Sequence, residues 1–167
     1  MGKRHSQVVN IDEVDAVESS HGNKFANKRK RLGALSGSQE IGCSWYEVPP
    51  GKQAFPHHAH YGNEESFFII SGSGQCRIGN ETVAVRAGDF VSFPRGEDYS
   101  HSLFNNGFEP LVYLGVSTAN QTDIMVYPDS KKIAIAGGAN MHAGLKAAKL
   151  HKMFKDQPNV DYYLDEE

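Results

Sequence analysis

Short runs of alternating apolar and polar residues occupy the middle of the chain, and this pattern predicts β-strands. The runs are rich in β-branched and aromatic residues, and turn-forming sequences such as PPGK, SGSG, PRGED and NNGFE separate them. Short strands at such regular spacing favour a β-sandwich or barrel. The expected strands are residues 41–48, 65–71, 75–79, 81–87, 89–94, 100–106 and 110–118.

The polarity of the chain divides it into three zones. Residues 1–37 are polar and are expected to form an N-terminal segment that packs on the barrel, which residues 38–127 build. Residues 128–167 form a C-terminal extension. Within it, MHAGLKAAKLHKMFK at 141–155 places apolar residues at roughly helical spacing and predicts a short helix. The closing VDYYLDEE is expected to dock on the barrel or on a second subunit.

Charge and cysteine content narrow the classes of partner. The 17 basic and 20 acidic residues of the 167 give a net charge of −3, which argues against a dominant role in binding nucleic acid or anionic membranes. No apolar stretch is long enough to span a bilayer, and the first residues lack the apolar core of a signal peptide. Cys43 and Cys76 are typical of unpaired thiols in a reducing compartment, although a disulfide between them stays open. We therefore expect a cytoplasmic protein without nucleic-acid or membrane partners.

Titratable residues crowd the segment FPHHAHYGNEES at 55–66. In an extended chain His58 and His60 point to one face and His57 points to the other. On the next strand Glu65 shares a face with two apolar residues, whereas Glu64 lies on the opposite face. Burying such groups without partners is costly, so they are expected to meet a ligand.

A fourth candidate ligand lies on a later strand, in the segment DYSHSLFNN. Together, His58, His60, Glu65 and His101 offer three imidazoles and one carboxylate, which suit one divalent transition metal such as Fe, Mn, Ni or Zn. Glu64 is the alternative carboxylate. Four protein ligands would leave two positions of an octahedral ion open for water, substrate or dioxygen.

The spacing of these residues resembles the two motifs of the cupin superfamily. The first, G(X)5HXH(X)3–4E(X)6G, is matched by His58, His60, Glu65 and Gly72, with Gly51 one residue farther from His58 than the pattern asks. The second, G(X)5PXG(X)2H(X)3N, is matched, with two extra residues before the histidine, by Gly88, Pro94, Gly96, His101 and Asn105. The resemblance covers about residues 41–117.

The resemblance implies an all-β fold, a double-stranded β-helix or jelly-roll barrel, with one metal inside. The segments PPGKQAFPHHAH, RAGDFVSFPRG, YPDSKK and VDYY are similar to a narrower group of small single-domain bacterial cupins without an assigned function. Cupins of this size commonly form dimers, so the resemblance also implies a homodimer.

Fold alone does not select a reaction, because cupins include dioxygenases, decarboxylases, isomerases and lyases. A metal-dependent enzyme acting on a small polar molecule is the first hypothesis, with Tyr61, Tyr99 and Tyr113 as candidate proton donors. The alternative is a non-catalytic module that binds a small, sugar-like ligand and keeps a structural metal. An apolar pocket with a saturated metal would favour that alternative, and its expected lining is Phe67, Ile69, Val91, Phe93 and Leu103.

Overall fold

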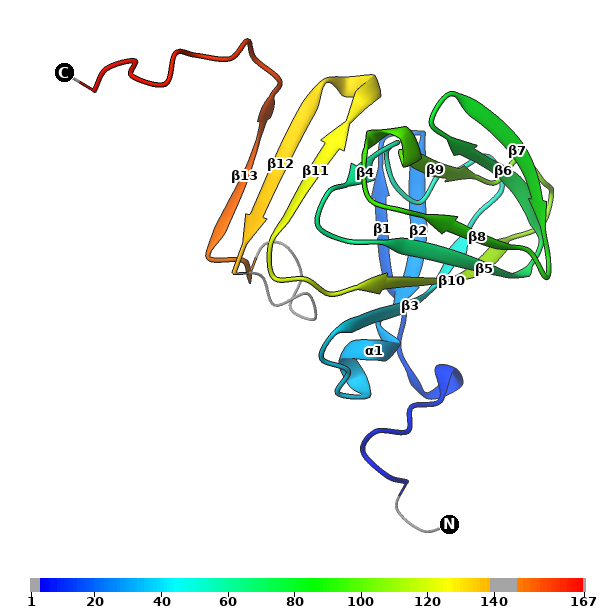
Figure 1. Ribbon diagram of the computed structural model, residues 1–167. Helices are drawn as coiled ribbons and strands as arrows, with labels where there is room; N and C mark the ends of the chain where they lie inside the picture. The colour runs from blue at the N-terminus through cyan, green and yellow to red at the C-terminus, as the bar shows by residue number, and fades with distance from the viewer. Residues whose placement is uncertain (1–3, 139–146, 167) are drawn as a thin grey trace.

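The computed structural model describes residues 4–138 and 147–166, and β-strands form most of it (Figure 1). Its helical elements are α1 (Leu32–Leu35) and the 3-10 turns η1 (Ile11–Glu13), η2 (Glu97–Tyr99) and η3 (Pro128–Ser130). Its strands are β1 (Val17–His21), β2 (Phe25–Lys30), β3 (Ile41–Val48), β4 (Ala59–His60), β5 (Glu65–Ser71), β6 (Ser73–Ile78), β7 (Glu81–Arg86), β8 (Phe90–Phe93), β9 (His101–Phe104), β10 (Leu111–Thr118), β11 (Asp123–Tyr127), β12 (Lys132–Gly137) and β13 (Leu150–Lys155).

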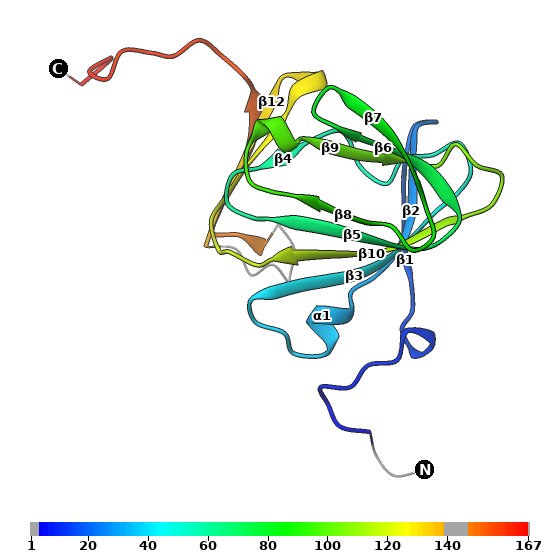
Figure 2. The same cartoon turned by 45° about the vertical axis from the view of Figure 1, so that its right-hand side comes forward.

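The strands form two facing layers, a double-stranded β-helix of the jelly-roll kind (Figures 1 and 2). One layer is a sheet in the order β1-β2-β3-β10-β5-β8. The other consists of the sheets β7-β6-β9 and β13-β12-β11-β4. An antiparallel bridge between His58 and His101 joins these two sheets.

The core lies between the layers, and strand alternation explains which residues enter it. On β3, Ser44, Tyr46 and Val48 are buried while the residues between them are partly exposed. Phe67 and Ile69 of β5 follow the same rule. The apolar cluster between the layers comprises Tyr46, Val48, Ala54, Phe67, Ile69, Cys76, Val85, Phe93, Leu103, Leu111 and Tyr113.

The polar N-terminal zone contributes two strands that the hydrophobic pattern did not predict. β1 and β2 form a hairpin, and β2 pairs with β3, so the hairpin extends the large sheet. The strand β1 is fully exposed and β2 carries a basic run, so neither shows the apolar alternation of a half-buried strand. Backbone pairing with β3, rather than burial of apolar side chains, places them.

The predicted helix at residues 141–155 is wrong at its C-terminal end. Residues 150–155 form β13, which pairs along its whole length with β12. Backbone hydrogen bonds to β12 override the local helical spacing, as tertiary context commonly does. Residues 141–146 lie outside the described residues. No helix in the described part of the chain is long and apolar enough to cross a membrane.

The C-terminal end leaves apolar surface exposed. Every residue of β13 is exposed, and the segment after it extends away from the barrel in both views (Figures 1 and 2). Its exposed apolar side chains are Leu150, Met153, Phe154, Val160, Tyr162, Tyr163 and Leu164.

Candidate metal centre

The four residues predicted as metal ligands come from neighbouring strands of the two layers. His60 ends β4, His58 lies just before it, Glu65 begins β5 and His101 begins β9. His58 and His101 hydrogen-bond each other through their backbones, with N···O distances of 3.0 and 2.7 Å. Two candidate ligands therefore form the bridge between the two sheets of one layer.

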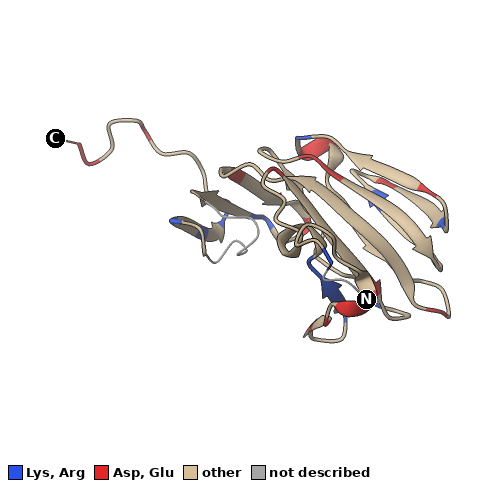
Figure 3. Cartoon of the chain, turned by 90° about the horizontal axis from the view of Figure 1, so that it is seen from below, with Lys and Arg blue, Asp and Glu red and all other residues tan. Residues whose placement is uncertain are grey.

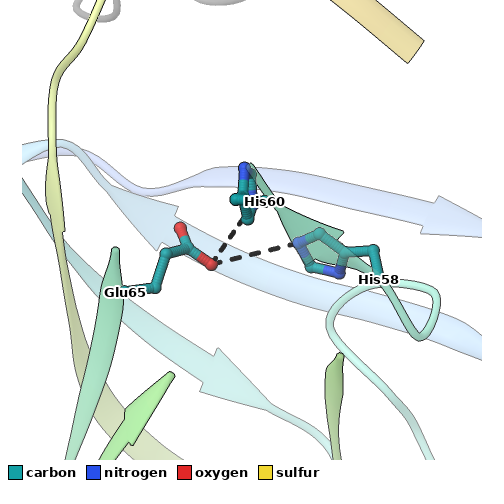
Figure 4. A group of neighbouring side chains, drawn as sticks. All are labelled: His58, His60 and Glu65. Carbon is teal, nitrogen blue, oxygen red and sulfur yellow. Dashed lines mark ion pairs between the residues drawn. The ribbon is translucent and has the colours of Figure 1, made fainter. Parts of the chain in front are cut away.

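One carboxylate oxygen lies at the centre of the group. The Oε2 atom of Glu65 is 3.1 Å from Nε2 of His101, 3.5 Å from Nε2 of His60 and 3.9 Å from Nε2 of His58. Figure 4 shows His58, His60 and Glu65 pointing toward one another. The donor atoms of these three residues all lie within 4.8 Å of one another, close enough to hold a metal ion.

The outer nitrogen of each imidazole has its own acceptor, and this fixes the orientation of the ring. Nδ1 of His58 donates to the carbonyl of Pro56 at 2.8 Å, and Nδ1 of His101 donates to the carbonyl of Tyr99 at 3.1 Å. Nδ1 of His60 meets the Asp123 carboxylate at 2.5 Å. A neutral imidazole that carries its proton on Nδ1 directs the lone pair of Nε2 at the centre.

These lone pairs and an anionic oxygen need a cation between them. Three acceptor nitrogens and one carboxylate oxygen repel one another unless a proton or a metal ion lies between them. In addition, Nε2 of His60 is buried and has no hydrogen-bond partner among the described residues. The donor set, three imidazoles and one carboxylate, fits a divalent transition metal.

Burial and neighbouring charges move the pKa values of the group in opposite directions. Burial, together with the charge of His101, lowers the pKa of His58 to about 4. Burial also lowers that of His60, but the carboxylates of Asp123 and Glu65 outweigh it and raise its pKa to about 10. Burial raises the pKa of Glu65, whereas the histidines around it hold that pKa well below its usual value. The group therefore favours an anionic Glu65 with positive charge beside it.

Asp123 is a further member of the candidate centre that the sequence did not reveal. It is 2% exposed, and its carboxylate accepts hydrogen bonds from the Gly62 amide at 2.8 Å and from the Asn63 side chain at 2.9 Å, besides its contact with His60. Burial raises its pKa, but the interactions with His60 and Asn63 lower it overall. A carboxylate in this position orients a ligand imidazole and raises its basicity.

The structure distinguishes between the two adjacent glutamates. Glu65 points into the barrel, whereas Glu64 is exposed, and its backbone amide donates to the Thr118 hydroxyl at 3.0 Å. Strand alternation is the reason, because successive residues of a strand face opposite sides.

The three candidate tyrosines lie in different surroundings. Tyr61 and Tyr99 are exposed, at 49% and 42%. Tyr113 is fully buried in the barrel, and burial raises its pKa well above the usual value. Tyr113 is therefore the one whose phenol lies inside the barrel with Glu65.

His57 lies apart from the centre. Alternation directs it to the other face, as predicted, and it is buried there, at 4% exposed. It lines a separate cavity of about 450 Å³ between the β1–β2 turn and η3, which Ser19, Lys24, Phe55 and Lys132 also line.

Aromatic rings surround the centre. The ring of His101 stacks on Phe93 at a centroid distance of 3.8 Å and lies edge-on to Phe67 at 5.6 Å. The ring of His58 stacks on Tyr127 at 5.8 Å. These contacts restrict ring rotation, so the imidazoles are held in place before any ligand arrives.

Comparison with known proteins identifies the class of this barrel. Residues 44–117 match the family model of the cupin domain, and these residues carry all four members of the centre. Residues 44–117 therefore form a cupin domain.

Solved structures show the same fold over most of the chain. One from Acidithiobacillus ferrooxidans, described as a candidate sugar phosphate isomerase, is 23% identical, covers 93% of this chain and 97% of its own, and has a TM-score of 0.80. A sugar phosphate isomerase of the cupin superfamily from Silicibacter pomeroyi is 18% identical, with coverage of 89% and 92% and a TM-score of 0.75. A predicted oxalate decarboxylase from Thermotoga maritima is 26% identical, with coverage of 66% and 97% and a TM-score of 0.59. Among curated proteins, none matches the chain.

Proposed function

We propose that the protein is a metal-dependent enzyme that acts on a small polar molecule inside the barrel. His58, His60, Glu65 and His101 would hold one divalent ion, which as a Lewis acid polarises a substrate oxygen or, if it is iron, activates dioxygen. The observation that carries the proposal is the convergence of three Nε2 atoms on one oxygen of Glu65, each ring held by its own acceptor on Nδ1.

The residues of the chain have separate roles in this proposal. Asp123, Pro56 and Tyr99 hold the imidazoles in the tautomer that can bind an ion. Phe67 and Phe93 pack beside His101 and exclude water from that side. Tyr113 stays protonated because of its raised pKa, so its hydroxyl is available to donate a hydrogen bond to a bound molecule.

An isomerase reaction is the first activity to test. Two structures that cover most of this chain, from Acidithiobacillus ferrooxidans and Silicibacter pomeroyi, are described as sugar phosphate isomerases, one of them as a candidate. Decarboxylase, lyase and dioxygenase reactions would be tested next. The metal found by elemental analysis would set their order.

A binding module with a structural metal is the second candidate. The predicted apolar lining supports it, because Phe67 and Phe93 are buried against His101 and Leu103 is buried in the same apolar cluster. An enzyme needs coordination positions open to substrate, whereas a structural site is closed.

Elemental analysis of untagged protein tests the metal. The wild-type chain should contain one equivalent of Fe, Mn, Ni or Zn, and the His58→Ala/His101→Ala variant should contain almost none, because half of the donor set is gone. The matched control is His151→Ala, which removes an exposed imidazole on β13 and should keep the full metal content. Equal metal in wild type and the double variant, or no metal in the wild type even after reconstitution, would contradict the ligand assignment.

A homodimer and a cytoplasmic location belong to the same proposal. The exposed apolar residues of β13 and of the segment after it support pairing with a second copy of the chain. The free thiols of Cys43 and Cys76 support a reducing compartment.

A further inference from the structure

Four consecutive cations begin in β2, and Figure 3 marks the basic positions along the ribbon. The register with β3 assigns two of them to the outer face of the barrel. Lys28 lies opposite Glu47 and binds its carboxylate at 3.0 Å, and the ammonium of Lys30 lies over the Trp45 ring at 5.2 Å. Residues directly opposite each other in antiparallel strands share a face, so these two lysines have partners outside the core.

Arg29 lies on the inner face. It is opposite the buried Tyr46, its guanidinium is 5.5 Å from that ring, and its Nε donates to the buried hydroxyl of Ser44 at 3.3 Å. Asn27, two residues earlier on the same face, is also buried. Among residues 4–138 and 147–166 no carboxylate forms an ion pair with Arg29. Arg29 is half-buried, and a bound anion would stabilise a cation that faces the interior without a counter-ion.

The inner face of the large sheet separates Arg29 from the candidate metal centre. Arg29 aligns with Tyr46, Tyr113 and Ile69 across three strand spacings, about 14 Å, and Glu65 lies about 13 Å farther along β5. The backbones of Arg29 and Glu65 are therefore about 19 Å apart along the sheet. Ser44 and Gly115 lie opposite each other on this face, and the rings of Tyr46 and Phe67 lie beside Gly115. A ligand that contacts both ends is therefore an elongated molecule that carries its anionic group at one end.

A buried hydroxyl lies between these two ends. Tyr113 is fully buried, and its hydroxyl has no hydrogen-bond partner among the described residues. Its ring stacks on Tyr46 at 4.9 Å and packs on Phe67 at 4.8 Å. In the register of the sheet Tyr113 lies opposite Tyr46, which is itself opposite Arg29.

We propose that Arg29 is the anion-recognition residue of this barrel. It binds the carboxylate or phosphate group of a small molecule whose other end lies at the centre formed by His58, His60, Glu65 and His101. Its planar guanidinium offers parallel N–H donors that match either group, with Ser44 and Tyr113 as further polar contacts. The inference rests on the proposed function, because it assigns a charge to the substrate of that site.

Calorimetric titration of the full chain with inorganic phosphate, and separately with acetate, tests the proposal. Arg29→Gln should weaken binding about tenfold or more, because it removes the charged donors. Arg29→Lys keeps the charge and should retain intermediate affinity. Lys28→Gln, which neutralises the neighbouring outward cation, is the matched control and should bind like the wild type. Binding of phosphate alone or acetate alone identifies the anionic group of the substrate.

Other outcomes overturn the proposal. These are wild-type protein that binds neither anion at millimolar concentration, Arg29→Gln that binds as well as the wild type, and Lys28→Gln that loses binding to the same degree. Metal content, measured on the same samples, separates this proposal from the previous one. If phosphate binding depends on Arg29 in protein that contains no metal, the anion site stands and the metal assignment fails.

Discussion

At the scale of single residues, the candidate centre includes groups that would not touch a bound ion. Asp123 meets Nδ1 of His60 and is itself held by Asn63 and Gly62. A carboxylate there makes the opposite nitrogen a better ligand than a neutral acceptor does.

Asp123→Asn should therefore lower metal affinity about 10- to 100-fold while the four ligands remain in place. Competition with a chromophoric chelator measures the change. Asp129→Asn is the matched control, since Asp129 is an exposed carboxylate paired with Arg77 on the surface. If the two variants bind metal equally well, Asp123 has no part in tuning the centre.

The sequence predicts the residues of the centre to different degrees. His58, His60, Glu65 and His101 follow from motif spacing, and strand alternation favours Glu65 over Glu64. Asp123 has no such signal, because it lies far along the chain from His60 in a segment without a motif. Its role arises only from the pairing of β11 with β4. The role proposed for Arg29 has no signal in the sequence for a different reason: a run of basic residues is typical of a solvated surface.

At the scale of elements, the turn after β4 is built for close approach to β11. A Cβ atom at Gly62 would lie 2.3 Å from the Thr122 carbonyl oxygen and 2.9 Å from Oδ1 of Asp123. Only glycine therefore allows this turn to pack against the start of β11 and bring Asp123 to His60.

Gly62→Ala should lower the free energy of unfolding by about 1–3 kcal/mol, because the backbone must shift to relieve the contact. It should also weaken metal binding, since Asp123 moves with it. Chemical denaturation and metal titration measure the two effects. The control is Gly137→Ala on β12, where the added Cβ would have ordinary contacts at 3.5 Å and little effect is expected. Equal stability of both variants would show that the turn tolerates a side chain.

The sequence predicted the strands whose residues alternate between buried and exposed. It did not predict the strands that form only through backbone pairing with a neighbour. The predicted bounds of β3 and β5 coincide with the structure because both strands have one buried face. Every residue of β13 is exposed, so its sequence shows no alternation between a buried and an exposed face. The strand forms because its backbone pairs with the edge of β12. A short basic segment with a few apolar residues has no period strong enough to distinguish helix from strand.

At the scale of the whole molecule, the C-terminal segment determines our expectation for assembly. Tyr162 and Tyr163 are 86% and 73% exposed on a segment that extends away from the barrel. Several apolar and aromatic side chains exposed together on one segment are typical of surfaces that bind another protein, whereas a single exposed aromatic side chain is ordinary.

The wild-type chain should therefore have a solution mass twice its 18.4 kDa, and replacing Tyr162 and Tyr163 by serine should shift it toward the monomer. Light scattering after size exclusion measures the mass. Phe108→Ser is the control, because Phe108 is a 98% exposed aromatic in a distant loop and should not alter the mass. An unchanged dimer in the tyrosine variant, or a monomeric wild type, would contradict this assembly.

The bridge between His58 and His101 has a consequence for the thermal stability of the fold. One layer of the barrel consists of two sheets that meet at these two residues, and both contribute an imidazole to the centre. An ion held there would act as a crosslink between segments far apart in sequence, and it would bind the native chain better than the unfolded one. The midpoint of thermal unfolding would then rise with the concentration of free metal, so the persistence of the barrel in a cell would depend on the supply of that element.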